Sequence, residues 1–437
     1  MPTFFHDAIL VQLGPPSVAT GNLRQVDGTI VDVGADVSAE PGDEIVDCDQ
    51  TVLMPGLVNG HTHLYSALAA GMPAPPRKPQ NFQELLQLVW WRLDRAHSLE
   101  SVQCSGAIGA LAALRCGTTT LIDHHASPSA IDGSLSALQA GIGQIGNRGL
   151  LCYEVTDRNG PAEATQGLKE NERYALNCQQ ENSGQFAALV GGHASFTMEE
   201  DSLAACVDLA HRLKTGIHIH VAEDPIDEQI SRQRYGGGLL QRFKRHGLLQ
   251  VAQTVLAHGT HLSADDFAEL NDLQVQLAHN PNSNMNNGVG YTPVARFTGP
   301  TLLGTDGIGA DMWREARTAQ FKSHDAHRAL PMEKPLAMLA ESARFASRSL
   351  GVPLGRLEAG AAADLVLTCY RPPTPLAAEN LAAHFIYAMG PELVRDVMID
   401  GHWCLRAGQV VCCDENALRS SAVEVARQLY QRMENFP

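Results

Sequence analysis

Between residues 55 and 350 the sequence alternates short apolar segments with longer stretches of helical periodicity. Eight apolar segments have the length and composition of strands: residues 56–63, 118–123, 149–155, 186–193, 216–221, 254–258, 275–279 and 301–306. Strands that alternate with helices in this way are typical of parallel βα units. Eight such units over about 290 residues predict a (β/α)8 barrel, a TIM barrel with insertions, in the α/β class.

The polar residues of these segments lie at their carboxyl ends. The first segment ends at His63, the fifth carries His218 and His220, and the eighth ends at Asp306. In such a barrel the carboxyl ends of the strands form the rim on which active sites are built. The pattern therefore favours an enzyme. A doubly wound open sheet is the alternative fold, but the glycines at 141, 143 and 146 do not follow a strand as its phosphate-binding turn requires.

The two ends of the chain are rich in short strands. Residues 1–55 and 356–414 contain short β-prone segments separated by turn signals such as Asp27-Gly28 and Asp400-Gly401. Neither piece can bury a face alone, so we predict that they meet in one small β-sandwich beside a barrel domain of residues 56–355. Residues 415–437 have helical periodicity and predict a C-terminal helix.

Composition restricts the partners and the compartment. The formal net charge is −16 and no local cluster of Lys and Arg offsets it, so we expect no nucleic acid polymer as a partner. The ten cysteines form no CxxC pair, which is typical of reduced thiols. No stretch approaches about 18 uninterrupted apolar residues and the amino terminus lacks the pattern of a secretion signal. We therefore expect a cytoplasmic protein with no membrane contact.

Two pairs of histidines indicate a metal site. Side chains of a strand alternate between its faces, so His61 and His63 point the same way, as do His218 and His220. Within the second pair His220 lies nearer the rim, which leaves His218 as a packing residue one layer deeper. Asp306 ends the eighth strand, which closes the barrel against the first. We therefore expect His61, His63, His220 and Asp306 to converge, and such groups are ligands of zinc.

These motifs resemble those of the amidohydrolase superfamily, in particular its branch of triazine hydrolases and nucleobase aminohydrolases. The matching segments are PGLVNGHTH (55–63), GTTT (117–120), HVAE (220–223), AHGTH (257–261), HNPNSN (279–284), LGTD (303–306) and GRLEAGAAADLV (355–366). They extend over almost the whole chain. Further matches at VWWRLD (89–94), DHHASP (123–128) and YRPPTP (370–375) are most similar to the SsnA-type aminohydrolases.

The resemblance implies a ligand set and a type of metal site. His61, His63, His220 and Asp306 would hold one divalent metal ion, with zinc the expected ion and iron the alternative. Members of the superfamily with two metal ions bridge them with a carboxylated lysine on the fourth strand. Residues 186–195 contain no lysine. A mononuclear site is therefore expected.

The resemblance also implies the roles of the remaining site residues. Asp306 would accept a proton from the metal-bound water, and Glu223 would pass a proton to a ring nitrogen of the substrate. General acid–base transfer of this kind is worth about 10²- to 10⁴-fold in rate. His258 would orient the attacking hydroxide and polarise the developing alkoxide. His193 would contact the substrate.

The implied reaction is the deamination of a nitrogen heterocycle. The substrate would be a purine-related, pterin-like or pyrimidine base, attacked by metal-bound hydroxide with release of ammonia. One alternative keeps the same site in a triazine-type hydrolase that expels chloride or an alkylamine. An alternative of another class is a non-catalytic barrel used as a binding module. The resemblance further implies a homo-oligomer, with a dimer expected.

Several residues near the rim have two interpretations. His124 and His125 are neighbours and point to opposite faces of a strand, so at most one enters the barrel, either as a substrate contact or as a structural hydrogen-bonding residue. Trp90 and Trp91 fit either a lid over a planar ring or ordinary helix packing. His279 is interpreted as a core residue with satisfied hydrogen bonds. Residues 282–284 are expected to brace the rim loop.

Overall fold

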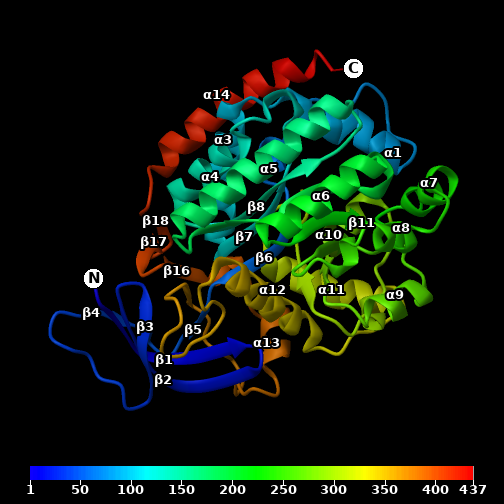
Figure 1. Cartoon of the computed structure of the whole chain (residues 1–437). Helices are drawn as coiled ribbons and strands as arrows, with labels where there is room; N and C mark the ends of the chain where they lie inside the picture. Colours follow the sequence, from blue (N-terminus) through cyan, green and yellow to red (C-terminus); the bar gives the residue numbers. More distant parts are fainter. Residues whose placement is uncertain (437) are drawn as a thin grey trace.

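A closed parallel β-barrel forms the centre of the protein, which a computed structural model describes over residues 1–436 (Figure 1). The barrel strands pair in the order β6-β7-β8-β10-β11-β12-β13-β14, and a bridge between Thr62 and Asp306 closes the ring. Their bounds are β6 (Leu57–Thr62), β7 (Thr118–His125), β8 (Arg148–Val155), β10 (Val190–Ala194), β11 (Ile217–Val221), β12 (Val255–His258), β13 (Gln276–His279) and β14 (Thr301–Leu303). A short β9 (Phe186–Ala188) pairs with β8. The predicted (β/α)8 barrel is confirmed.

The barrel strands are buried because helices and the barrel interior cover both of their faces. Every residue of β6, β7 and β8 is buried, as is usual for parallel strands enclosed in this way. The helices that follow the strands are α3 (Leu99–Arg115), α4 (Ser134–Ile145), α5 (Pro161–Glu181), α6 (Glu200–Leu213), α7 (Ile226–Tyr235), α8 (Leu239–Arg245), α9 (Ala264–Leu270), α10 (Pro281–Asn287), α11 (Met312–Asp325) and α12 (Lys334–Leu350).

Both ends of the chain contribute to a second, mixed sheet of nine strands. Its members are β1 (Thr3–Leu13), β2 (Pro16–Val26), β3 (Thr29–Gly34), β4 (Glu44–Asp47), β5 (Val52–Pro55), β15 (Leu365–Thr368), β16 (Val394–Ile399), β17 (His402–Arg406) and β18 (Gln409–Val410). The two halves join where β5 pairs antiparallel with β15. Figure 1 shows the blue N-terminal strands beside the orange C-terminal segment. The predicted meeting of the chain ends is confirmed, while the numerical domain boundaries stay predictions.

Two hairpins of this sheet turn at the dipeptides that the sequence singles out. β2 is joined to β3 through Asp27 and Gly28, with φ of 48° and 79°. β16 is joined to β17 through Asp400 and Gly401, with φ of 53° and 73°. Positive φ at both central residues is the geometry that tight hairpins prefer, and Asp-Gly adopts it readily.

The remaining helices lie around the carboxyl rim and the chain end. After β6 come α1 (Phe82–Leu85), a π-helix η2 (Leu86–Trp90) and α2 (Trp91–Ala96), and α13 (Leu381–Tyr387) precedes β16. The predicted terminal helix is α14 (Glu415–Met433), which packs on α2 and α3. Across the described residues, no helix combines the length and apolar character needed to cross a bilayer.

Candidate metal centre

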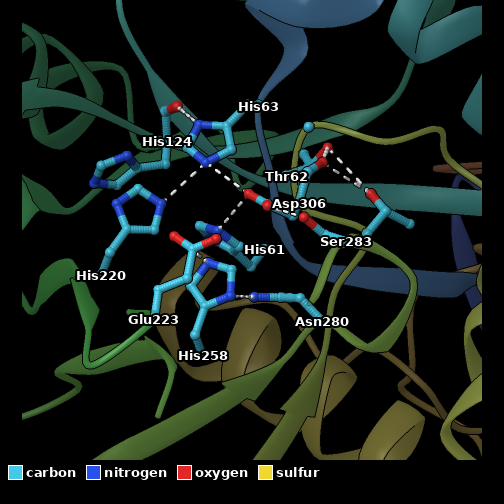
Figure 2. Close-up of polar contacts among 12 residues, drawn as sticks. His61, Thr62, His63, His124, His220, Glu223, His258, Asn280, Ser283 and Asp306 are labelled. Carbon is cyan, nitrogen blue, oxygen red and sulfur yellow. Dashed lines mark hydrogen bonds and ion pairs between the residues drawn. The ribbon is translucent and has the colours of Figure 1, made fainter. Parts of the chain in front are cut away.

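Three histidines and an aspartate meet at the carboxyl ends of the barrel strands (Figure 2). Oδ1 of Asp306 lies 3.2 Å from Nε2 of His61 on β6 and 2.9 Å from Nε2 of His63, the residue after β6. Nε2 of His220 on β11 lies 3.0 Å from Nε2 of His63. All four side chains are buried. The structure therefore brings the four predicted metal ligands together.

The outer hydrogen bonds of two histidines determine which ring nitrogens carry hydrogen. Nδ1 of His63 lies 2.5 Å from the carbonyl oxygen of His124, and Nδ1 of His220 lies 2.7 Å from that of His193. A carbonyl oxygen only accepts, so both Nδ1 atoms donate, and each neutral ring has its lone pair at Nε2. Two such Nε2 atoms cannot hydrogen-bond to each other. Their convergence with a carboxylate oxygen fits a cation, and these Nδ1 contacts are the usual outer partners of metal-bound histidine.

The donor set agrees with a divalent metal ion. Two groups of side chains place ligand atoms within 4.8 Å of one another: His61, His220, His258 and Asp306 in the first, and His63, His124 and His220 in the second. Imidazole nitrogen and carboxylate oxygen are the donors that catalytic zinc sites use. The histidine cluster is therefore a metal site by its chemistry as well as its geometry.

Asp306 is held by backbone and side-chain contacts. It adopts a left-handed φ of 54°, its amide donates to the carbonyl oxygen of His61 at 2.9 Å, and its carbonyl accepts from Oγ1 of Thr62 at 3.1 Å. Its Oδ2 accepts a hydrogen bond from the hydroxyl of Ser283. Burial alone would raise the pKa of Asp306, but its close contacts with the rings of His61 and His63 lower it well below its ordinary value. The carboxylate is therefore ionised at neutral pH.

Glu223 and His258 face each other beside the cluster. Oε2 of Glu223 lies 3.6 Å from Nε2 of His258, at the end of β12. Nδ1 of His258 donates to Oδ1 of Asn284 at 2.8 Å, because Nδ2 of Asn284 donates to Thr292 and so fixes the amide orientation. A neutral His258 therefore presents a lone pair at Nε2, which suits it to accept a hydrogen bond rather than to donate one. Burial raises the pKa of Glu223.

One short helix orients three of these groups. The side chains of α10 pair with site residues as follows: Ser283 with Asp306, Asn284 with His258, and Asn287 with Glu223. Beneath α10, the buried Glu315 accepts from the amide of Asn282 at 3.4 Å, and burial raises the pKa of Glu315 to about 8. Residues 282–284 were expected to brace the rim loop, in a segment that often lines the pocket in the family, and Ser283 lines it here. Asn287 was missed, although its spacing of four residues from Ser283 puts both on one helix face.

A buried carboxylate holds the loop that carries Glu223. Ala222 has a left-handed φ of 48°, and its amide donates to Oδ2 of Asp227 at 2.8 Å. The other oxygen of Asp227 accepts from the amide of Phe196 at 3.0 Å. Burial raises the pKa of Asp227 to about 7. Asp227 thus ties two walls of the site together, and no sequence motif pointed to it.

A pocket opens beside the cluster. Phe82, Trp90 and Trp91, from the segment after β6, line it together with the polar site residues. The two tryptophans also pack in apolar clusters, which confirms the packing interpretation, while the lid stays a prediction. Aromatic walls of this kind suit a planar ring.

His193 lines the same pocket. Its Nδ1 lies 2.6 Å from Oγ1 of Thr197, whose hydroxyl donates to the carbonyl oxygen of Ala194 at 3.1 Å. The hydroxyl has one hydrogen, so Nδ1 of His193 is the donor and Nε2 is left as an acceptor. Burial lowers the pKa of His193 to about 4, so the ring is neutral at pH 7.

The other histidines near the rim have structural contacts. His124 enters the barrel, where its Nε2 lies 3.0 Å from the carbonyl oxygen of Gly192, while Nε2 of His125 lies 2.9 Å from Oγ of Ser127. Within the described part of the chain neither ring lines the pocket. Both rings therefore have structural hydrogen bonds, and a substrate contact by either one stays a hypothesis.

Two further histidines were interpreted as core residues. Nε2 of His218 lies 2.8 Å from Nδ1 of His61, so His218 is the deeper, hydrogen-bonded residue that the strand pattern predicts. His279 is buried, but neither of its ring nitrogens has a hydrogen-bond partner among residues 1–436. The expectation of satisfied hydrogen bonds at His279 is wrong. Alternation along a strand cannot reveal whether a buried ring finds hydrogen-bond partners.

Known proteins resemble the chain over nearly its full length. The profile of the Amidohydrolase family matches residues 52–404. A 5-methylthioadenosine/S-adenosylhomocysteine deaminase from Desulfitobacterium hafniense is 30% identical over 386 residues, 85% of each chain. A protein of the same name from Syntrophomonas wolfei is 28% identical over 397 residues, 89% of each chain.

Solved structures agree with the fold. An adenosine deaminase from Xanthomonas campestris with bound zinc superposes with a TM-score of 0.82 at 24% identity, over 98% of both chains. At that identity the likeness supports the architecture alone. The family profile, however, spans most of the sequence and includes the segments that carry the histidine cluster. This chain therefore belongs to the amidohydrolase family and is an enzyme of that family.

Proposed function

We propose that the protein is a metal-dependent hydrolase that deaminates a purine-related nitrogen heterocycle with release of ammonia. The observation that carries the proposal is the pairing of a cation-fitting cluster with Glu223 and His258 at one aromatic-lined pocket. The curated relatives named as deaminases of adenine nucleosides support this class of substrate. The family resemblance implied a free base as well, so nucleosides and free bases both belong in the test.

The proposed ligands of the metal ion are His61, His63, His220 and Asp306. Zinc is the first candidate, supported by the bound zinc of the Xanthomonas campestris structure, and iron is the alternative. When bound, a divalent ion acts as a Lewis acid and lowers the pKa of water to about 7. A single ion is proposed because β10 contains no lysine that could bridge two.

The side chains around the ion divide the proton transfers. Asp306, ionised beside the histidines, accepts a proton from the attacking water at Oδ1. Nε2 of His258 accepts a hydrogen bond from that water and so orients it. Glu223 is protonated more readily than an exposed glutamate, because burial raises its pKa, and can deliver the proton to a ring nitrogen. Protonation there makes the adjacent carbon more electrophilic. After attack, Asp306 passes the proton that it accepted to the amino group, which leaves as ammonia, and the remaining hydroxyl proton returns to Glu223.

Ammonia release is the direct test. Zinc-loaded protein is assayed against adenosine, 5′-deoxyadenosine, 5-methylthioadenosine, guanine, pterins, pyrimidine bases and triazines, with product masses recorded. The proposal expects ammonia from at least one purine-related compound. Loss of chloride or an alkylamine instead would identify the triazine-type alternative, and silence across the panel with metal bound would reject deamination.

Two variants separate the metal site from the proton relay. Glu223→Gln is expected to keep the metal and lose activity by about 10²- to 10⁴-fold, the range for general acid–base transfer. His61→Ala is expected to lose the metal, as measured by elemental analysis. If Glu223→Gln and Asp306→Asn both left the measurable function unchanged, the protein would be a binding module. The dimer stays a prediction, which sedimentation can check.

A further inference from the structure

Glu154 brings an unused carboxylate to the wall of the pocket. It lies at the carboxyl end of β8, its side chain is 4% exposed, and it lines the pocket with His193. Its oxygens lie 3.4 Å from Nδ1 of His124 and 3.7 Å from Nη2 of Arg158. These contacts are long for a buried carboxylate, which is costly unless it is closely paired.

The neighbouring cation already has a partner. Arg158 pairs with the buried Asp94 of α2, and its guanidinium lies 4.9 Å from the ring centroid of Trp91. Burial alone would raise the pKa of Glu154, but His193, His124 and Arg158 lower it to about 2. Glu154 is therefore an ionised acceptor at neutral pH, held in place rather than neutralised by Arg158.

His193 adds a second acceptor beside the first. β8 and β10 are neighbouring strands, and Glu154 pairs with Gly191, two residues before His193. Because Nδ1 of His193 donates to Thr197, its Nε2 can only accept while the ring is neutral. Glu154 and His193 thus give this pocket wall two hydrogen-bond acceptors.

We infer that this wall selects substrates that present two adjacent hydrogen-bond donors to Glu154 and His193, which makes the two residues determinants of specificity. The inference rests on the proposed function, because it names the substrate class of the same site. Two chemical sources can supply the donors: neighbouring N–H groups of an oxo- or amino-substituted base, or the vicinal hydroxyls of a ribose.

The position of the wall favours ring N–H groups. The ring of His124 touches Glu154 and packs at centroid distances of 5.3 Å from His63 and 4.7 Å from His220. The carboxylate is therefore one imidazole away from the metal cluster. If the reacting carbon of a heterocycle lies at that cluster, another edge of the same ring lies against Glu154 and His193.

Matched probes test the inference through binding as well as turnover. Zinc-loaded wild type, Glu154→Gln and Glu170→Gln are titrated with guanine against 1-methylguanine and 9-methylguanine, which each lack one ring N–H. The same proteins are titrated with adenosine and with 2′,3′-dideoxyadenosine, which lacks the two vicinal hydroxyls of the ribose. Dissociation constants are measured, with kcat and KM from ammonia release for any probe that is hydrolysed. Glu170, buried on α5 away from the pocket, is the matched control.

Wild type is expected to bind the probe that keeps both donors about 10- to 100-fold more tightly than the paired probe that lacks one. This factor is the range for a hydrogen bond to a charged group. Glu154→Gln keeps the volume, and so the steric part of the preference, but is expected to lose most of this factor. Glu170→Gln is expected to keep it.

The outcomes separate the two proposals. If wild type prefers guanine to its methylated forms and Glu154→Gln weakens this preference, the donors are ring N–H groups. If it prefers adenosine to 2′,3′-dideoxyadenosine and Glu154→Gln weakens that preference, the donors are ribose hydroxyls. Either result supports the inference. Equal binding of the paired probes, no binding of any probe, or an unchanged preference in Glu154→Gln overturns it. Donor-selective binding without ammonia release rejects deamination and leaves the donor selection standing.

Discussion

The hydroxyl of Ser283 is expected to set the affinity of the site for its metal ion. It donates to Oδ2 of Asp306, while Oδ1 of the same carboxylate faces the Nε2 atoms of His61 and His63. One oxygen is thus left for the ion and the other is held by the helix α10. Ser283→Ala removes the donor and leaves Oδ2 of an ionised, buried carboxylate without its partner.

The magnitude follows from two independent estimates. A hydrogen bond to a charged group is worth about 1.5–3 kcal/mol, and loss of an outer partner of a metal ligand costs about 10- to 100-fold in metal affinity. The two agree, because about 1.4 kcal/mol corresponds to a factor of ten. Ser283 is 1% exposed, so bulk water does not reach the vacated position directly. We expect the Kd for zinc to rise by about 10- to 100-fold.

Competition with a chromophoric chelator measures this Kd. Ser283→Thr keeps a hydroxyl and is expected to retain most of the affinity. The matched control is Ser134→Ala, because the buried hydroxyl of Ser134 on α4 has no hydrogen-bond partner in the described part of the chain. Wild-type zinc affinity in Ser283→Ala would show that the contact with Asp306 does not tune the ligand, and the reasoning would fail.

Three further predictions concern the same surroundings. Asn284→Ala frees the tautomer of His258, so kcat is expected to fall by about 10²-fold with zinc content unchanged in elemental analysis. Asp227→Asn places an amide N–H₂ group against one of the two backbone N–H groups that donate to Asp227, which is expected to shift the loop that carries Glu223. We expect kcat to fall by about 10²-fold. Steady-state kinetics at equal zinc occupancy measures this change. The pKa of Glu315 is about 8 in the folded protein, against an ordinary value of 4.5. The unfolded chain therefore loses this proton at a lower pH than the folded protein does. The free energy of unfolding is expected to fall as the pH rises from about 4.5 to about 8. Glu315→Gln is expected to lack this fall and to have the higher Tm at pH 8, with no difference below pH 4.5, in calorimetry across pH.

The barrel and the position of the cluster follow from local patterns. Strand alternation places His61 beside His63 on one face, and the rule that parallel strands end at a common rim brings His220 close to them. Asp306 was expected at the end of the eighth strand, yet β14 ends at Leu303. The ligand still arrives because its bridge to Thr62 closes the barrel.

What the sequence does not reveal is the backbone geometry and the long-range pairing at the rim. His258 and Asp306 both adopt a left-handed φ, of 76° and 54°, which residues with a Cβ adopt rarely and which surrounding contacts must enforce. Asn287 and Asp227 act through partners outside their own segments. Neither the 3.6-residue nor the two-residue periodicity carries information about such partners.

Three carboxylates at one pocket differ in what their surroundings do to them. Asp306 has a lowered pKa beside two histidines, Glu223 a raised pKa through burial, and Glu154 a lowered pKa beside His193 and Arg158. Environments that move acidic groups apart in this way divide the roles of proton acceptor, proton donor and recognition. All three are acidic residues at or just after the carboxyl ends of barrel strands, so their types and positions do not distinguish them. Packing after folding raises the pKa of Glu223 and lowers that of Glu154, in agreement with the proton donor and the charged acceptor proposed above.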